Sequence, residues 1–133
     1  MLDAALVTDG EKIRRVEPEA ILRGRAVLCP GTKAVLLCSG GRRIFVTSGG
    51  VPMPGSATAV SCGMSERDSV SVSALSGERA MLSVRRRLPV ISGGEVCVQE
   101  LALRGDSDWE LTALRGGVLL CLGMEPEKLG ELL

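Results

Sequence analysis

The sequence predicts a mainly β protein, a β-rich α+β fold in which hairpins build a small antiparallel barrel or a two-sheet sandwich. Two observations support this expectation. Apolar and polar side chains alternate with a period of two along residues 68–103, as they do in half-buried strands. Glycine-containing turns also separate the apolar runs of the chain. A length of 133 residues suits one domain over residues 1–133.

The first hairpin is expected around an Asp-Gly dipeptide, which is the strongest short-range hairpin signal in a sequence. Ala4–Thr8 and Glu11–Val16 would be its two strands. A two-residue loop between them would place Leu6 opposite Ile13.

Residues 18–23 are predicted to form a short helix, because a proline suits the first helical position and a glycine follows the segment. Arg25–Cys29 would add a short strand. Lys33–Ser39 and Arg42–Thr47 then flank a Gly-Gly loop and carry apolar side chains on both faces, which predicts a hairpin central to the core. Its expected pairs are Leu37 with Ile44, Leu36 with Phe45 and Val35 with Val46.

Residues 48–56 are the longest irregular stretch, since they contain two prolines and three glycines. Loops of this kind often carry function. Thr58–Cys62 is expected to form a strand, with a helix that starts at Ser56 as the alternative. A helix there would turn the glycine-rich loop into an anion cradle. A shaped connection is favoured, because the chain has neither of the glycine motifs that bind nucleotide phosphates.

The alternating stretch is predicted to form a three-stranded antiparallel meander, and two registers compete at its first turn. A two-residue loop would leave two apolar side chains on the serine-rich face, at a cost of about 1.5–3 kcal/mol each. A three-residue loop at residues 76–78 instead pairs Val70 with Val84 and Val72 with Leu82. Its cost is one left-handed backbone at a non-glycine residue, about 1–2 kcal/mol. The three-residue loop is therefore favoured.

The second turn of the meander is predicted from its glycines. A three-residue loop at residues 92–94 ends in glycine, as a hairpin with a terminal bulge prefers. It would pair Val90 with Val96 and Leu88 with Val98.

The apolar face of the long second strand is interrupted once, by Arg86. The two predicted registers place Arg86 beside Asp68 on one side and Glu100 on the other. A charge on an apolar face requires a partner, and opposite charges across strands support pairing. We therefore expect a structural cluster of Asp68, Arg86 and Glu100, with a ligand-binding role for Arg86 as the alternative.

The C-terminal third is predicted to be partly helical. Ser107 and Glu110 have the spacing of a capping box, so a helix is expected over residues 108–115, ending at Gly116. The apolar run at residues 118–122 is either a buried strand or the same helix resumed. A proline then opens a short C-terminal helix with leucines on one side.

Missing residue types exclude several chemistries. The chain has no histidine, which rules out Ser-His and Cys-His nucleophile systems. The five cysteines are scattered without a Cys-x-x-Cys pair, so they are expected to be buried free thiols in a reducing compartment rather than metal ligands. We expect no cofactor, no metal and no catalytic residue, and an enzyme is the less favoured class.

The charge of the chain is balanced but unevenly distributed. The formal net charge is zero, yet basic residues predominate up to Arg87 and acidic residues predominate after it. Such asymmetry is typical of halves that face each other or a neighbouring copy, and it can also mark a basic face for an anionic partner. No apolar run approaches the ~20 residues of a transmembrane helix, and the N-terminus lacks a secretory signal. We therefore expect a cytoplasmic protein without membrane contact.

A candidate binding face lies on the outward side of the long second strand. It contains Arg79, Arg85 and Arg87, with Ser69 and Ser71 on the neighbouring strand. Such a face could hold the phosphates of a nucleic acid or another anion. Against nucleic acid, the chain has few aromatic side chains on which bases could stack.

The expected function is a non-catalytic interaction or assembly module that forms a homo-oligomer or binds a protein partner. Anion or nucleic-acid binding through the arginine face is the first alternative. An enzyme of unidentified chemistry that uses the loop at residues 48–56 is the second. An anion, a protein contact or a deep pocket on the arginine face would discriminate between these classes.

Overall fold

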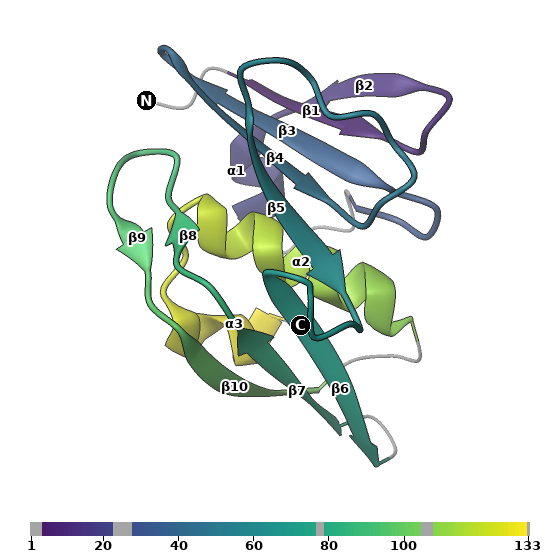
Figure 1. Cartoon of the computed structure of the whole chain (residues 1–133), viewed down its shortest axis with the longest axis vertical. Helices are drawn as coiled ribbons and strands as arrows, with labels where there is room; N and C mark the ends of the chain where they lie inside the picture. The colour runs from purple at the N-terminus through teal and green to yellow at the C-terminus, as the bar shows by residue number, and fades with distance from the viewer. Residues whose placement is uncertain (1–3, 23–27, 77–78, 105–107, 133) are drawn as a thin grey trace.

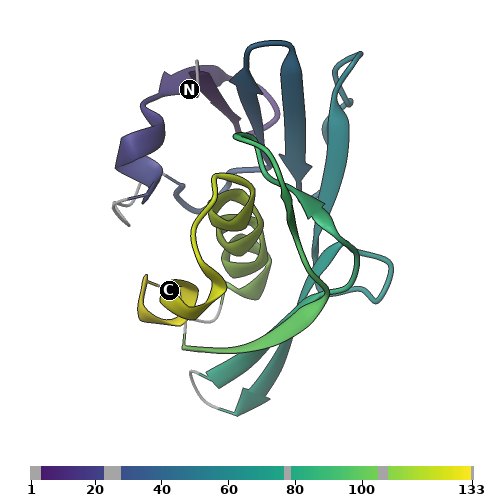
Figure 2. The ribbon, with the colours of Figure 1, turned by 90° about the vertical axis from the view of Figure 1, so that its left-hand side faces the viewer.

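The computed structural model describes residues 4–22, 28–76, 79–104 and 108–132. At its centre an apolar helix, α2 (Trp109–Cys121), lies on the concave side of a curved β-sheet (Figure 2). The short helices α1 (Pro18–Leu22) and α3 (Pro126–Leu132) lie on the same side of the sheet. The helix and the sheet are therefore the two layers that enclose the main core.

The described residues form one large sheet and one small hairpin (Figure 1). The strands are β1 (Ala4–Thr8), β2 (Ile13–Val16), β3 (Ala34–Ser39), β4 (Arg42–Thr47), β5 (Thr58–Gly63), β6 (Val70–Ser76), β7 (Arg79–Val84), β8 (Leu88–Pro89), β9 (Glu95–Val96) and β10 (Gln99–Arg104). The large sheet has the order β10-β7-β6-β5-β4-β3-β1-β2, and β8 pairs with β9. The mainly β, α+β class is confirmed. The barrel is not closed, because β2 and β10 are the two edges of the sheet.

β5 joins two antiparallel halves of the large sheet. Its first four residues, Thr58–Ser61, pair in parallel with β4. Its last two, Cys62 and Gly63, pair in parallel with the start of β6. The strand predicted over Thr58–Cys62 is confirmed. The sheet has a seam here, because each half is bonded to a different part of one short strand.

Helix α2 is buried on nearly all sides. It contacts β4, β5, β6, β8 and α3, and most of its residues are buried. A helix that is apolar all round is stable in water only when it is enclosed. The curved sheet provides that enclosure, and α2 in turn fills the space that a closed barrel would fill with strand side chains.

Gly117 marks a close contact between α2 and the seam. A Cβ atom on Gly117 would lie 2.5 Å from Cys62 Sγ on β5 and 3.2 Å from Val46 Cγ1 on β4. It would lie 3.7 Å from Val70 Cγ2 on β6. A Cβ atom at this position would overlap Cys62 Sγ and crowd Val46 Cγ1, whereas its distance from Val70 is an ordinary contact, so glycine allows the close approach of α2 to β5 and β4.

The prediction that the helix ends at Gly116 is wrong. The helix continues to Cys121, and the apolar run at residues 118–122 is the same helix resumed. A glycine within a helix costs about 1 kcal/mol relative to alanine. Burial of each residue of Val118–Leu120 contributes about 1.5–3 kcal/mol, which outweighs two glycines.

Both ends of α2 are capped. Asp108 is the N-cap, and its Oδ1 accepts a hydrogen bond from Leu111 N at 3.1 Å. The serine predicted for this role, Ser107, lies outside the described residues. At the other end Gly123 has a φ of +102°, and the N–H of Met124 bonds back to the helix. This arrangement is a Schellman motif, which requires a left-handed residue where the helix ends.

The short helices match the predictions. α1 begins at Pro18 as expected, and α3 begins at a proline and buries Leu129 completely. Of the strand predicted over Arg25–Cys29, only the last two residues are described, and they lie in no strand. The carbonyl of Leu28 accepts instead from the Arg115 guanidinium on α2, at 2.6 and 3.1 Å.

The first hairpin has a wider turn than predicted. Residues Asp9–Lys12 form the loop, so Leu6 lies opposite Arg15 and not Ile13. The Asp9 Oδ1 atom accepts bonds from the backbone N–H groups two and three residues further on, at 2.9 and 2.8 Å. A carboxylate that captures two N–H groups stabilises a longer turn. The shift of two residues leaves each side chain on its predicted face.

The β3–β4 hairpin has all the predicted pairs and apolar side chains on both faces. One face contacts the main core. On the other face a small outer core is formed by Ala34, Leu36 and Phe45. Val51, from the loop at residues 48–56, and Ala57 pack against this outer core. The loop is fastened by Arg43, whose Nη1 donates to the carbonyl of Gly55 at 3.1 Å.

The first register of the meander is confirmed. Val70 pairs with Val84 and Val72 pairs with Leu82, and all four are buried. The register shifts between Ala74 and Ser76, so a bulge precedes the turn. The remaining residues of the predicted turn lie outside the described residues.

The second register is wrong, because the predicted long strand breaks at residues 85–87. β8 follows the break, and Leu88 pairs with Val96, two residues away from the predicted partner. The hairpin loop is longer than expected, since the N–H of Ile91 donates to the Cys121 carbonyl at 2.8 Å. The buried side chain of Ile91 therefore draws the loop onto the end of α2.

β10 shows its opposite face to the core relative to the prediction. Leu101 lies opposite Leu82, and Leu103 is buried. Val98, expected opposite Leu88, is 62% exposed. An odd shift of register moves every side chain of a strand to the other face. This register places Leu101 and Leu103 toward the core. It buries a larger apolar area than the predicted register, which would have placed Val98 and Ala102 there.

Substitution of Gly117 tests the contact at the seam. Alanine is the better helix former by about 1 kcal/mol, but its methyl group would overlap Cys62 Sγ. Overpacking of a stiff core costs about 3 kcal/mol at the upper end of its usual range. We expect Gly117→Ala to lower the free energy of unfolding by about 2 kcal/mol in urea titrations.

The double variant Cys62→Ala/Gly117→Ala controls this experiment. Removal of Sγ provides room for the new methyl group, so the two substitutions should couple favourably in a double-mutant cycle. Additive effects, or a Gly117→Ala variant as stable as the wild type, would show that α2 does not need this approach.

Candidate functional site

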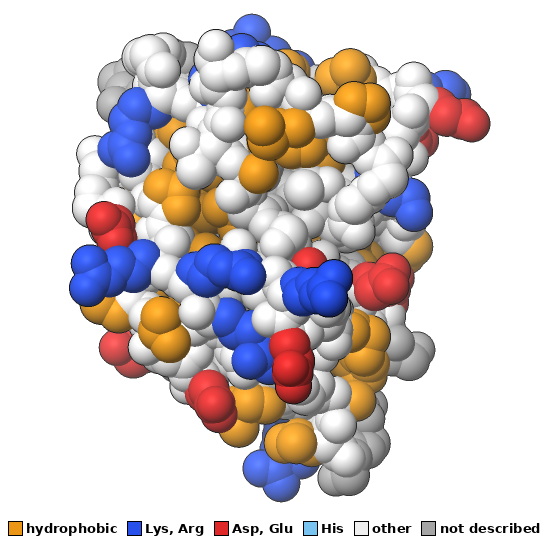
Figure 3. Space-filling model, viewed as in Figure 1, with side chains coloured by type: hydrophobic (Ala, Val, Ile, Leu, Met, Phe, Trp, Pro, Cys, Tyr) orange, Lys and Arg blue, Asp and Glu red, His pale blue; other side chains and the backbone are white. Residues whose placement is uncertain are grey.

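The break between β7 and β8 presents consecutive arginines on the outer face of the sheet. Arg85, Arg86 and Arg87 are all exposed. Arg67, in the loop that leads into β6, lies beside them, because its carbonyl accepts a bond from Arg86 Nη1 at 2.8 Å. These four residues are called the arginine band. Figure 3 shows basic side chains in blue across the middle of this face.

Two serines, Ser71 on β6 and Ser69 just before it, form hydrogen bonds with the guanidinium groups of Arg85 and Arg86. Arg85 Nε donates to Ser71 Oγ at 2.8 Å, and its backbone N–H donates to the Ser69 carbonyl at 2.9 Å. Arg86 Nη1 also donates to Ser69 Oγ at 3.4 Å. Ser71 is only 2% exposed although it lies on the outer face. The terminal nitrogens of Arg85 form no bond with the described residues, so they can bind a partner.

The predicted cluster of Asp68, Arg86 and Glu100 is not formed. Glu100 lies opposite Ser83, because β10 has a different register from the predicted one. Asp68 Oδ2 accepts instead from Ser65 N at 3.1 Å. The chain leaves the sheet at the position where Arg86 would have entered the apolar face. Its charge is therefore solvated, which removes the need for a buried partner.

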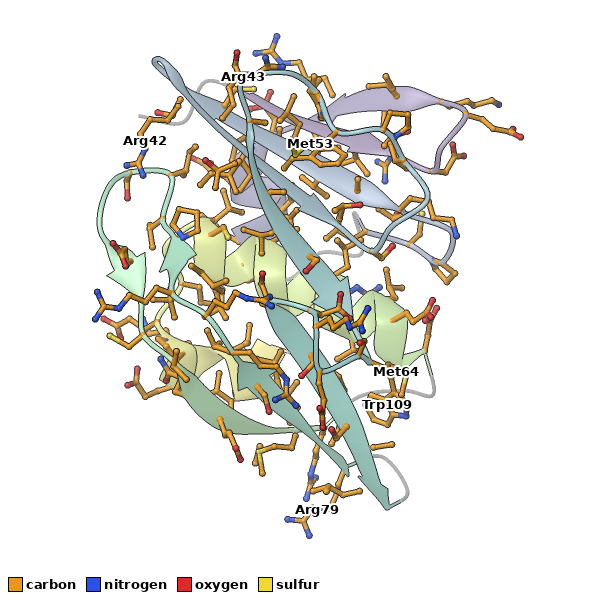
Figure 4. All side chains as sticks on the ribbon, viewed as in Figure 1. Arg42, Arg43, Met53, Met64, Arg79 and Trp109 are labelled. Carbon is orange, nitrogen blue, oxygen red and sulfur yellow. The ribbon has the colours of Figure 1, made fainter. Side chains whose placement is uncertain are left out.

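One end of the band borders an open cleft of about 370 Å³ beside the β8–β9 hairpin. Arg87 and Arg42 line the cleft together with Thr58, and Figure 4 shows Arg42 next to the hairpin. The guanidinium of Arg87 lies 4.0 Å from the carboxylate of Glu95, with side chains 77% and 56% exposed. An exposed pair of this kind is worth about 0–1 kcal/mol, so a partner can replace it.

The structure brings most of the predicted binding residues together. These are Ser69, Ser71, Arg85 and Arg87. Arg79 lies at the far end of β7 (Figure 4), opposite Arg104 on β10. Sequence reasoning missed Arg67 and Arg42, because they lie in a loop and at a strand end without periodicity. A binding role for Ser69, Ser71, Arg85 and Arg87 stays a prediction, and Arg79 lies apart from them.

The cysteines are free but not all buried. Cys62 and Cys121 lie in the core, as expected. Cys29 and Cys97 are exposed, which corrects the prediction, because both lie between regular elements rather than in them. Burial raises the pKa of the Cys121 thiol to about 12, and burial raises that of Cys62 well above its ordinary value. The two buried thiols are therefore protonated and unreactive at neutral pH.

The described residues offer little for catalysis. They contain no group of three side chains that could hold a metal ion. Ser48 and Lys33 are neighbours, but Ser48 Oγ donates to the Lys33 backbone carbonyl at 3.0 Å. The cavity beside them is about 80 Å³, far below the ~300–1,000 Å³ of small-molecule sites.

Comparisons with known proteins identify no family for this chain. No family model, no curated protein and no solved structure matches this chain. No helix in the part of the chain that the structure describes is long and apolar enough to cross a membrane. The choice of the arginine band as the candidate site is therefore based on the geometry of this chain alone.

The buried thiols predict how stability depends on pH. The folded-state pKa of Cys121 is raised from 9.0 to about 12, so its contribution to stability is complete below the pKa of the unfolded thiol. That contribution is lost as the pH rises toward 12, by about 1.4 kcal/mol per pH unit for each thiol. Urea unfolding at about pH 8 and about pH 10.5 should therefore show a smaller loss for Cys121→Ala than for the wild type. An equal loss in both proteins would contradict the burial of this thiol.

Proposed function

We propose that this chain is a non-catalytic interaction module whose arginine band binds an acidic surface of a protein partner. The observation that supports the proposal is the arginine band itself, with four exposed arginines on one face of the sheet. Arg85 and Arg86 are already ordered by hydrogen bonds, so less side-chain entropy is lost on binding. A guanidinium group also matches a carboxylate in two parallel bonds.

An acidic protein fits the band better than a nucleic acid does. Proteins that bind single strands stack the bases on aromatic side chains. Phe45 is buried in the outer core, and Trp109 lies at the start of α2, on one side of the view in Figure 4. Exposed Glu66 and Glu95 also lie beside the band in sequence or in space. Their carboxylates would repel the phosphates of a duplex, which are spaced at about one charge per 1.7 Å, more strongly than the more widely spaced carboxylates of an acidic chain.

The cytoplasm is the compartment that suits this module. Cys29 and Cys97 are exposed and free, and exposed thiols persist in a reducing environment. Two further features favour binding over catalysis: the chain has no histidine, and the cleft at the band is open and lacks a paired acid and base.

The proposal is tested with a labelled poly-L-glutamate chain as the acidic probe. Fluorescence anisotropy at low salt should show binding to the wild type. Arg85→Glu/Arg87→Glu should weaken it, by about tenfold for each 1.4 kcal/mol of binding free energy that the two arginines supply. The control is Arg79→Glu/Arg104→Glu, which makes the same change of net charge at two exposed arginines outside the band. It should bind as the wild type does.

Two results would contradict the proposal. Equal weakening by the control variant would show that net charge, and not the band, attracts the probe. A single-stranded oligonucleotide that binds the wild type more tightly than poly-L-glutamate would favour a nucleic-acid partner. Both variants should keep Cys62 and Cys121 unreactive toward a thiol reagent, which verifies that the core is folded.

A further inference from the structure

A groove of about 530 Å³ lies on the other side of the β8–β9 hairpin, where α2 turns into α3. Its walls are partly apolar and come from two places in the chain. Val90 and Val96 contribute from the hairpin, and Leu120 and Met124 contribute from the end of α2 and the turn after it. Such walls suit the aliphatic stem of a long charged side chain.

The rim of the groove is acidic. Glu95 on β9 and Glu127 on α3 both line it, and both are exposed. None of the described residues that line the groove is basic. A side chain with an apolar stem and a cationic head would therefore fit there. Arginine is such a side chain, and it pairs with carboxylates in a fixed geometry.

We propose that the occupant of this groove is the arginine band of a second copy of the chain. The inference rests on the proposed function and names the acidic protein surface that the band binds. The charge of the molecule supports it: the formal net charge is zero, so two copies do not repel each other overall. The complementary surfaces attract each other locally, and this attraction is screened by salt.

The two surfaces lie on either side of one hairpin, so the inferred contact pairs the band of one copy with the groove of the next, head to tail. Arg87 belongs to the band, and Glu95 lines both the cleft beside the band and the groove, so their exposed pair links the two surfaces within one copy. In this head-to-tail arrangement the contact between copies is heterologous, and each end of the assembly still offers a free band or a free groove. Association of this type builds open assemblies of many copies, and their average mass should rise with protein concentration.

Light scattering with in-line size separation tests the association. The average mass of the wild type should exceed that of a monomer at about 0.01 M salt and fall toward it at about 0.15 M, where screening shortens to ~8 Å. Arg85→Gln/Arg87→Gln removes charge from the band, and Glu95→Gln/Glu127→Gln removes it from the groove. Each variant alone should remain monomeric. A mixture of the two should form one-to-one dimers and nothing larger, because only one intact band meets one intact groove.

The control variant for the mixture is Arg79→Gln/Arg104→Gln, which makes the same change of charge as the band variant. It should associate as the wild type does. If it becomes monomeric as well, or if the mixture contains no dimers, the pairing of band with groove is wrong.

Thiol labelling locates the contact on the surface. Cys97 lines the groove, whereas Cys29 lines a different cavity beside the β1–β2 hairpin. Under associating conditions, labelling of Cys97 should slow by about tenfold relative to dilute protein, in proportion to the occupied fraction. Labelling of Cys29 should not change. Equal protection of both thiols would place the contact elsewhere.

The outcomes separate this inference from the proposed function. A wild-type protein that remains monomeric at low salt but binds poly-L-glutamate through the band would overturn the second copy as partner and leave the proposed function standing. A protein that neither associates nor binds the acidic chain would overturn both. Association that persists in the band variant and in the groove variant would reject the pairing of these two surfaces.

Discussion

The contact between Gly117 on α2 and the seam of the sheet holds the two halves of the fold together. β5 pairs with β4 through its first residues and with β6 through its last two, so few backbone bonds connect the two halves. Val46, Cys62 and Val70 come from the three strands and meet the helix at one residue. Packing of α2 against the seam therefore supplies the cohesion that a continuous ladder would supply elsewhere. The absence of a Cβ atom lets one helix contact both halves.

The interruption of the apolar face at Arg86 determines where the arginine band and the acidic groove lie. The strand leaves the sheet there, and Leu88 and Ile91 return to the core at the other end of α2. The resulting β8–β9 hairpin stands apart from the large sheet, with the arginine band before it and the acidic groove behind it. One unburied charge thus separates a basic surface from an acidic one. The uneven distribution of charge along the chain therefore appears in the fold as two separate surfaces, one basic and one acidic.

The register of β6 with β7 could be predicted because one alternative left valine and leucine on a serine face, and the energy difference was large. The interruption at Arg86 was a correct observation with a wrong interpretation. A charge on an apolar face can be satisfied by a partner or removed by a break in the strand. The choice depended on Ile91, which bonds to the end of α2. Nothing near residue 91 in the sequence indicates that helix.

Local sequence patterns predict the strand-rich class, the β3–β4 hairpin, the apolar face of β6 and β7 and several of the arginines in the band. These features follow from alternation, turn residues and local costs within a few neighbouring positions. Long-range packing was needed to establish the continuation of α2 through Gly116, the register of β10, the positions of Arg67 in the band and of Arg42 beside it, and the acidic groove. Each of these depends on contacts between segments far apart in the chain. The free energy of burial that settles them exists only when the core is assembled.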